Sequence, residues 1–80
     1  MKSLKKTRVK PNQRYKHYKG GEYIILLVAR DSNTLENLVV YQGQYTSEEF
    51  GENPIWVRSL KEFTEVITRE GKTFPRFSLM

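Results

Sequence analysis

The side chains that catalyse most enzyme reactions are scarce in this sequence. Its 80 residues hold one histidine, His17, one aspartate, Asp31, and no cysteine. A serine nucleophile needs a base that a third group orients, and no serine here lies in a Gly-x-Ser-x-Gly turn. A metal site needs several converging ligands, and we interpret the glutamates of residues 48–52 as a solvated loop. We therefore predict no catalytic residue, no metal site, no cofactor and no enzymatic activity, with a ligand sensor or enzyme using His17 as the remaining hypothesis.

Aromatic and basic side chains offer a different chemistry. Rings that alternate with cations stack on bases or hold an anion, whereas the same rings equally suit the core of a small β domain. For His17 the alternative is a structural hydrogen bond, and for Arg58 it is an ion pair with Glu36 or Glu22. The predicted ligand-binding residues are His17, Tyr18, Lys19, Tyr45, Trp56 and Arg58.

Positive charge is concentrated at the N-terminus. Residues 1–19 hold eight basic and no acidic side chains, whereas residues 20–80 hold six basic and nine acidic ones. Because residues 1–13 contain few apolar side chains, we predict that they form a flexible basic arm. Three alternatives are open for such an arm. It contacts nucleic-acid phosphates, it is only solvated, or it packs against the acidic remainder of the chain. The predicted phosphate-contacting residues are Lys5, Lys6, Arg8 and Lys10.

The remainder of the chain predicts short strands that position these residues. Residues 23–30 form an apolar run typical of a strand covered on both faces, and residues 38–45 pair with it as an antiparallel hairpin across loop 31–37. Gly43 indicates a bulge or a close approach of the backbone. Residues 46–54 are polar and predict a loop.

Three further strands are expected towards the C-terminus, over residues 55–58, 63–68 and 73–77. A single helical turn at residues 59–62 separates the first two, and Pro75 restricts the last to an edge. We predict an all-β fold, a small SH3-like five-stranded barrel over residues 14–80 that follows the flexible basic N-terminal arm, residues 1–13.

Length and hydropathy exclude other classes. The longest apolar run, residues 24–29, is far shorter than the roughly 20 residues that cross a bilayer, and no apolar segment follows the charged N-terminus as in a secretory signal. The absence of cysteine favours a cytoplasmic protein. We therefore expect no membrane interaction.

Several separated motifs resemble a bacterial family, the domain-of-unknown-function family 1653. They are YKHYKGGEY (15–23), ARDSNTLE (29–36), VVY (39–41), WVR (56–58), GK (71–72) and PRF (75–77). The resemblance covers about residues 15–77 and implies an SH3-type β-barrel in a small cytoplasmic bacterial protein of unestablished activity. The chain has Ser59 where the family usually has proline, and Asp31 where it commonly has histidine. The absence of a histidine at position 31 argues against a site built on two histidines.

Two binding functions fit these observations. The leading hypothesis is a small non-enzymatic binding module that engages an anionic partner, RNA or a ribonucleoprotein, through the basic arm and the aromatic and basic rim of the barrel. The alternative is a protein- or peptide-interaction module of SH3 type that captures its partner with the same rim.

Overall fold

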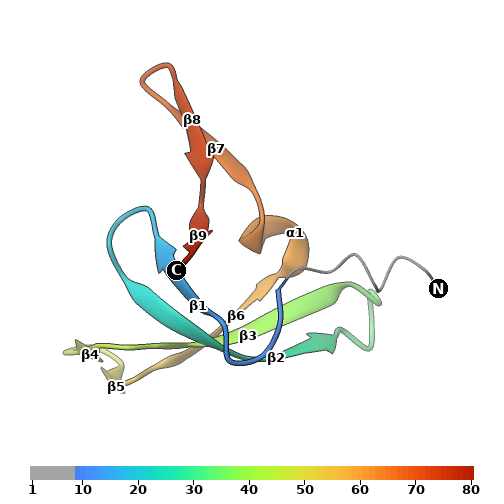
Figure 1. Ribbon diagram of the computed structural model, residues 1–80. Helices are drawn as coiled ribbons and strands as arrows, with labels where there is room; N and C mark the ends of the chain where they lie inside the picture. The colour runs from blue at the N-terminus through green and yellow to red at the C-terminus, as the bar shows by residue number, and fades with distance from the viewer. Residues whose placement is uncertain (1–8) are drawn as a thin grey trace.

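A five-stranded antiparallel sheet forms the centre of the molecule (Figure 1). The structure, a computed structural model, describes residues 9–80. The sheet has the strand order β6-β3-β2-β1-β9, and two small hairpins, β4–β5 and β7–β8, lie outside it. The elements are β1 (Arg14–His17), β2 (Glu22–Arg30), β3 (Asn37–Gly43), β4 (Thr46–Ser47), β5 (Gly51–Glu52), β6 (Ile55–Ser59), α1 (Leu60–Phe63), β7 (Val66–Arg69), β8 (Lys72–Pro75) and β9 (Phe77–Leu79).

The all-β prediction is confirmed, but the closed barrel is wrong. Among residues 9–80 the edge strands β6 and β9 do not pair with each other, so the sheet stays open. The segments expected as the fourth and fifth strands instead pair mainly with each other as β7 and β8. A tight turn joins them, in which Glu70 and Gly71 both adopt positive φ. This hairpin extends away from the sheet at the top of Figure 1, and only the short β9 returns to pair with β1.

The predicted hairpin of β2 and β3 is confirmed, but its first strand is not covered on both faces. The register shifts between Ile25 and Leu27, so a bulge moves the inward-facing set from odd to even residues. Ile25 is completely buried before the bulge, whereas Leu27 after it is 46% exposed. The continuous apolar run therefore reflects a change of face within the strand rather than burial on both sides.

Gly43 allows a close approach at the end of β3, and the bulge lies on β2 instead. A Cβ atom at Gly43 would lie 2.6 Å from the ring of Tyr45. The following segment, expected as a loop, contains the minimal hairpin β4–β5. The short turn α1 was predicted, and Ser59 caps it because its Oγ accepts a hydrogen bond from the backbone N–H of Glu62, 3.1 Å away.

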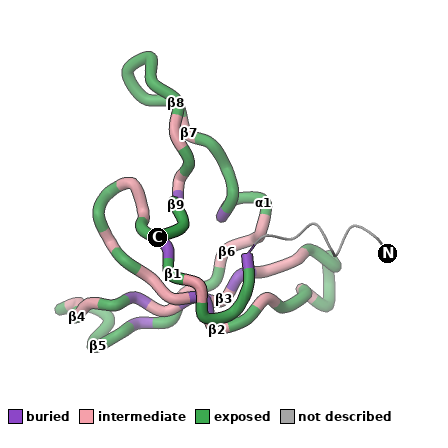
Figure 2. Tube along the Cα trace, in the orientation of Figure 1, coloured by how far each residue is buried: buried purple, intermediate pink, exposed green. Residues whose placement is uncertain are grey.

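One face of the sheet, called the inner face here, packs a small core against α1. Phe63, expected in a strand, ends α1 and is 1% exposed; its ring stacks on Phe77 with centroids 4.0 Å apart. Figure 2 shows the buried positions gathered where the strands cross and at α1, with hairpin β7–β8 largely exposed. The buried core residues are Val9, Tyr15, Ile25, Val39, Tyr41, Phe63 and Phe77.

Residues 9–13, the described part of the expected flexible arm, are held against the sheet. Val9 is only 3% exposed and belongs to the core, and the backbone N–H of Asn12 donates to the carbonyl of Ile25 at 2.8 Å. Burial of Val9 and this hydrogen bond hold residues 9–13 against the sheet. Lys5, Lys6 and Arg8 lie outside the described residues, and Lys10 is exposed. No helix within residues 9–80 has the length and apolar character of a membrane span.

Candidate functional site

A pocket of about 280 Å³ opens on the inner face of the sheet. Three basic side chains and four aromatic rings line it, and its lining includes no carboxylate. Strands β1, β2, β3, β6 and β9 and the turn between β1 and β2 all contribute to it. We call this site the aromatic pocket, and its residues are His17, Lys19, Gly21, Tyr23, Tyr41, Trp56, Arg58 and Phe77.

Strand register explains why these side chains meet. In an antiparallel sheet, residues directly opposite each other point to the same face. Tyr41 lies opposite Trp56, and His17 lies opposite Phe77. Arg58 follows Trp56 by two positions and so shares its face. Residues that are 15 to 60 positions apart in the sequence are brought together in this way.

Arg58 is held by two aromatic residues rather than by an acidic one. Its Nε donates to the hydroxyl of Tyr41 at 3.3 Å, and its guanidinium carbon lies 5.7 Å from the ring centroid of Phe77. The predicted ion pair with Glu36 or Glu22 is wrong, because Arg76 and Glu65 form the only ion pair within residues 9–80. The two Nη groups of Arg58 have no acceptor in this part of the chain, so they can bind an anion.

A short chain of hydrogen bonds fixes the tyrosines at one wall of the pocket. The indole N–H of Trp56 donates to the hydroxyl of Tyr45 at 3.2 Å, and that hydroxyl lies 3.1 Å from the hydroxyl of Tyr23. Burial, followed by the hydrogen bond with Tyr45, raises the pKa of Tyr23 far above its usual value of 10. Tyr23 therefore stays protonated and can donate a hydrogen bond at neutral pH.

His17 lies among rings and cations at the mouth of the pocket. Its ring stacks on Tyr18 with centroids 4.6 Å apart and meets the ring of Phe77 edge-on at 4.8 Å. Burial lowers the pKa of His17, and the positive charges of Arg58, Arg76 and Lys19 lower it further. His17 is therefore neutral at pH 7. Its Nδ1 accepts a hydrogen bond from the backbone N–H of Lys19 at 3.1 Å, so the ring proton resides on Nε2.

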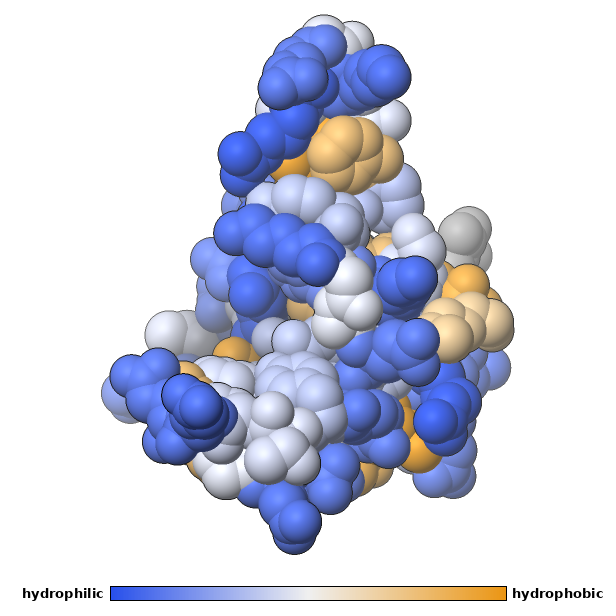
Figure 3. Space-filling view, turned by 90° about the vertical axis from the view of Figure 1, so that its left-hand side faces the viewer, coloured by the Kyte–Doolittle hydropathy of each residue, from blue (hydrophilic) through white to orange (hydrophobic). Residues whose placement is uncertain are grey.

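The aromatic surface continues beyond the pocket towards hairpin β7–β8. Tyr18 packs beside Phe74 with centroids 5.5 Å apart, and Arg69 donates to the Tyr18 hydroxyl at 2.9 Å while its guanidinium lies over the ring at 5.6 Å. Figure 3 shows side chains of intermediate hydropathy among hydrophilic ones on the face that it presents. Cations therefore flank rings both inside and outside the pocket.

The structure brings together most of the residues predicted from the sequence. His17, Lys19, Trp56 and Arg58 line the aromatic pocket. Tyr18 stacks at its mouth, and Tyr45 supports its wall through hydrogen bonds. The prediction did not include Gly21, Tyr23, Tyr41 and Phe77. The alternation of strand residues could have identified Tyr41 and Tyr23, whereas Phe77 joins the site only because β9 pairs with β1.

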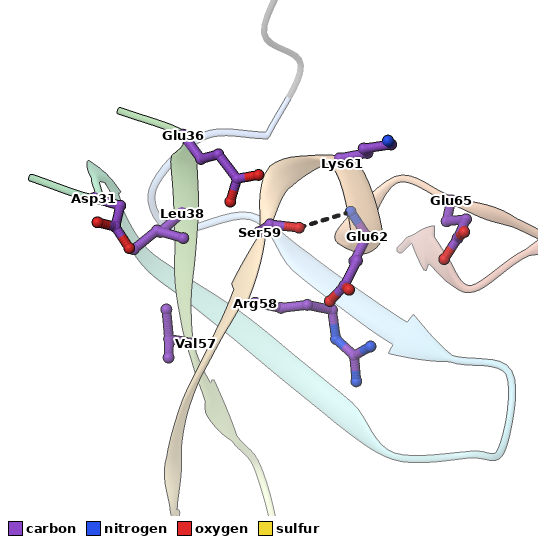
Figure 4. A pocket seen from close by; sticks show the side chains of 9 residues that line it. All are labelled: Asp31, Glu36, Leu38, Val57, Arg58, Ser59, Lys61, Glu62 and Glu65. Atoms are coloured by element: carbon purple, nitrogen blue, oxygen red, sulfur yellow. Dashed lines mark hydrogen bonds between the residues drawn. The ribbon is translucent and has the colours of Figure 1, made fainter. Parts of the chain in front are cut away.

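A second pocket, of about 650 Å³, has the opposite charge (Figure 4). Carboxylates from the loop between β2 and β3, from α1 and from the segment after α1 surround it. The carboxylates are those of Asp31, Glu36, Glu62 and Glu65. Within residues 9–80 no three His, Cys, Asp or Glu side chains converge as metal ligands would. Arg58 lines both pockets and so separates a basic surface from an acidic one.

Comparison with known proteins identifies a family without an assigned activity. The family profile described as "Protein of unknown function (DUF1653)" matches residues 13–79. A crystal structure of a DUF1653 protein from Bordetella bronchiseptica is 31% identical to the chain, with a TM-score of 0.74, and the match covers 94% of this chain and 88% of that one. None of the curated proteins matches the chain.

Proposed function

We propose that the chain, which belongs to the DUF1653 family of unknown function, is a non-enzymatic module that binds single-stranded RNA. The observation that carries the proposal is the lining of the aromatic pocket: two cationic side chains, a neutral histidine, four further rings and no carboxylate. Proteins bind single strands by combining a basic surface for the backbone with rings on which bases stack. The proposal places the protein in the bacterial cytoplasm, with free RNA or a ribonucleoprotein as its partner.

The succession of rings supports a partner longer than one nucleotide. Neighbouring centroids lie 5.5, 4.6 and 4.8 Å apart along the series Phe74, Tyr18, His17 and Phe77. Lys19 and Arg69 lie over the ring of Tyr18 within this series. A strand laid along it would meet rings and cations in turn. In this proposal Lys5, Lys6, Arg8 and Lys10 add phosphate contacts.

The test removes one positive charge from the aromatic pocket and one from elsewhere. Arg58→Gln should weaken binding of a short mixed-sequence single-stranded RNA about tenfold, since a hydrogen bond to a charged group contributes about 1.5–3 kcal/mol. Lys61→Gln is the matched control, because Lys61 is exposed and lines the acidic pocket instead. It should change the affinity less than about twofold.

Fluorescence anisotropy at low and at physiological salt measures both affinities. The affinity of the intact protein should fall as salt rises, because phosphate contacts release counterions. No binding by the intact protein, or the same loss for both variants, would contradict the proposal.

A protein- or peptide-interaction module of SH3 type is the second candidate. The observation in its favour is the open edge of the sheet: among residues 9–80, β6 pairs only with β3. Trp56 and Arg58, which line the aromatic pocket, lie on this edge strand. An extended peptide could add to β6 as a further strand and place its side chains against the rings. A peptide partner that RNA cannot displace would favour this function over RNA binding.

A further inference from the structure

The hydrogen bond between Arg58 and Tyr41 in the aromatic pocket has a fixed direction. The hydroxyl oxygen of Tyr41 accepts from Nε of Arg58 at 3.3 Å. A phenol carries one proton to donate, so Tyr41 keeps its own proton for another acceptor. The other Tyr41 contacts around the pocket are with rings, those of Tyr23 at 5.1 Å and Phe77 at 5.5 Å.

Tyr23 ends a chain of hydrogen bonds that begins at Trp56. The indole of Trp56 is a donor only, so the hydroxyl of Tyr45 accepts from it at 3.2 Å. The hydroxyls of Tyr45 and Tyr23 lie 3.1 Å apart, and either can donate to the other. Their contact uses one proton, so one of the two hydroxyls keeps a proton for a further acceptor at this wall of the pocket, which Tyr23 lines.

The remaining polar lining consists of donors as well. Nδ1 of His17 is occupied as an acceptor, so Nε2 carries the proton, and Arg58 and Lys19 have no acceptor atoms. The lining contains no Asp, Glu, Asn, Gln, Ser or Thr. A pocket of this composition favours a ligand that only accepts hydrogen bonds, which is the chemistry of an oxyanion.

Three rings close the inner end of the pocket. Tyr23, Tyr41 and Phe77 meet edge to face, with centroids 5.1 to 5.8 Å apart for all three pairs, and Tyr41 and Phe77 are 4% and 6% exposed. A polymer therefore cannot pass through and enters by one end. The volume of about 280 Å³ is at the lower limit of ligand pockets, about 300 Å³.

We infer that the aromatic pocket binds the terminal phosphate monoester of an RNA strand, an inference that rests on the proposed RNA-binding function. A terminal phosphate carries a charge of about −1.5 to −2 at pH 7 and three strongly accepting oxygens. An internal phosphodiester carries one charge and two such oxygens, and a carboxylate has two oxygens. The monoester therefore matches this set of donors better than either.

The experiment uses the intact protein and one short RNA sequence in three forms: with a 5′-phosphate, with a 3′-phosphate, and with hydroxyls at both ends. We expect one phosphorylated form to bind about tenfold more tightly than the hydroxyl form. Inorganic phosphate should remove this preference by competition.

Tyr23→Phe tests the tyrosine wall of the pocket, because it removes one hydroxyl and keeps the ring. It should reduce the preference for the phosphorylated end to less than about threefold. Tyr15→Phe is the matched control: Tyr15 is buried, its hydroxyl donates to Gln13 at 3.2 Å, and it lies outside the pocket. If Tyr23→Phe fails to fold, Lys19→Gln removes a positive charge from the exposed turn and should also reduce the preference.

The outcomes distinguish a failure of the terminal-phosphate inference from a failure of the proposed RNA-binding function. Equal binding of all three RNA forms would overturn the terminal-phosphate inference and leave RNA binding standing. An absence of RNA binding would overturn the proposed function, and with it the inference. A peptide that binds through its terminal carboxylate as tightly as the best RNA form would also overturn the inference, in favour of peptide capture.

Discussion

His17 and Tyr23 share an environment that favours their neutral forms. Burial lowers the pKa of His17 and raises that of Tyr23. Arg58, Arg76 and Lys19 add positive charge around His17, and the rings of Tyr18 and Phe77 cover it. Because His17 is neutral, it adds no positive charge to that of Lys19 and Arg58 in the pocket. A bound anion would offset that positive charge and favour protonation of His17.

At the residue scale we predict that His17 makes the protein less stable in acid. Its folded pKa lies below the usual 6.5, so the unfolded chain takes up the proton first as pH falls. The contribution of neutral His17 to stability is therefore complete above about pH 6.5 and is lost as pH falls through the folded pKa. Urea unfolding at pH 7.5 and 5.5 should show a larger loss for the native sequence than for His17→Gln. An equal or smaller loss would contradict the assignment.

At the scale of elements, one irregularity in each strand of the central hairpin shapes the pocket. The bulge after Ile25 turns β2 so that Tyr23 and Ile25 face inward before it and Val28 after it. At the end of β3, Gly43 leaves room for the ring of Tyr45 to fold back. Tyr45 then reaches Trp56 and Tyr23. The hydrogen bonds of Tyr45 to Trp56 and Tyr23 therefore depend on a glycine, without a Cβ atom, at position 43.

We predict that Gly43→Ala affects binding more than stability. The new Cβ would lie 2.6 Å from the ring of Tyr45, so the ring must move and give up its hydrogen bonds to Trp56 and Tyr23. Because Tyr45 is only partly buried, its ring can rotate outward, and the free energy of unfolding should fall by only about 1 kcal/mol. RNA affinity should fall several-fold.

A double-mutant cycle provides the control for this prediction. In a Tyr45→Ala background the added methyl group meets no ring, so Gly43→Ala should have little further effect on binding. An undiminished effect in that background would show that the backbone, and not Tyr45, is disturbed.

Across the whole molecule, charge and packing divide the surface into distinct regions. The aromatic pocket has three basic side chains and no acidic one, whereas four carboxylates surround the larger pocket. Between them the core is small and consists mostly of aromatic rings, with Phe63 and Phe77 stacked at its centre. Val9 completes this core from the segment before β1. The linings of the two pockets therefore differ in the sign of their charge.

At this scale we predict that Val9 contributes to folding. Val9→Ala removes two methyl groups from a site that is 3% exposed and should lower the free energy of unfolding by about 2 kcal/mol. Val57→Ala is the matched control, because Val57 is 59% exposed, and it should cost less than about 0.5 kcal/mol. Equal losses in urea unfolding would restore the flexible arm that the sequence suggested for residues 9–13.

Local patterns in the sequence were enough to predict the β class and several elements. The hairpin of β2 and β3, strand β6 and the turn α1 follow from apolar runs and breakers that lie next to each other in the chain. His17, Lys19, Trp56 and Arg58 were predicted as ligand-binding residues because rings and cations alternate there. These patterns involve residues that are close in the sequence, so they can be recognised without knowing which strands pair.

Long-range pairing decided the rest. The pairing of β9 with β1 brings Phe77 opposite His17, and that of β3 with β6 brings Tyr41 opposite Trp56. The bulge in β2, the open sheet and the burial of Val9 likewise depend on contacts between distant segments. An apolar or aromatic residue is equally satisfied by any buried face, so its type alone does not determine its neighbours. The pairing of the strands in the tertiary structure determines those neighbours. It brings Tyr23 and Tyr41, which are far apart in the sequence, to one pocket lined by hydrogen-bond donors.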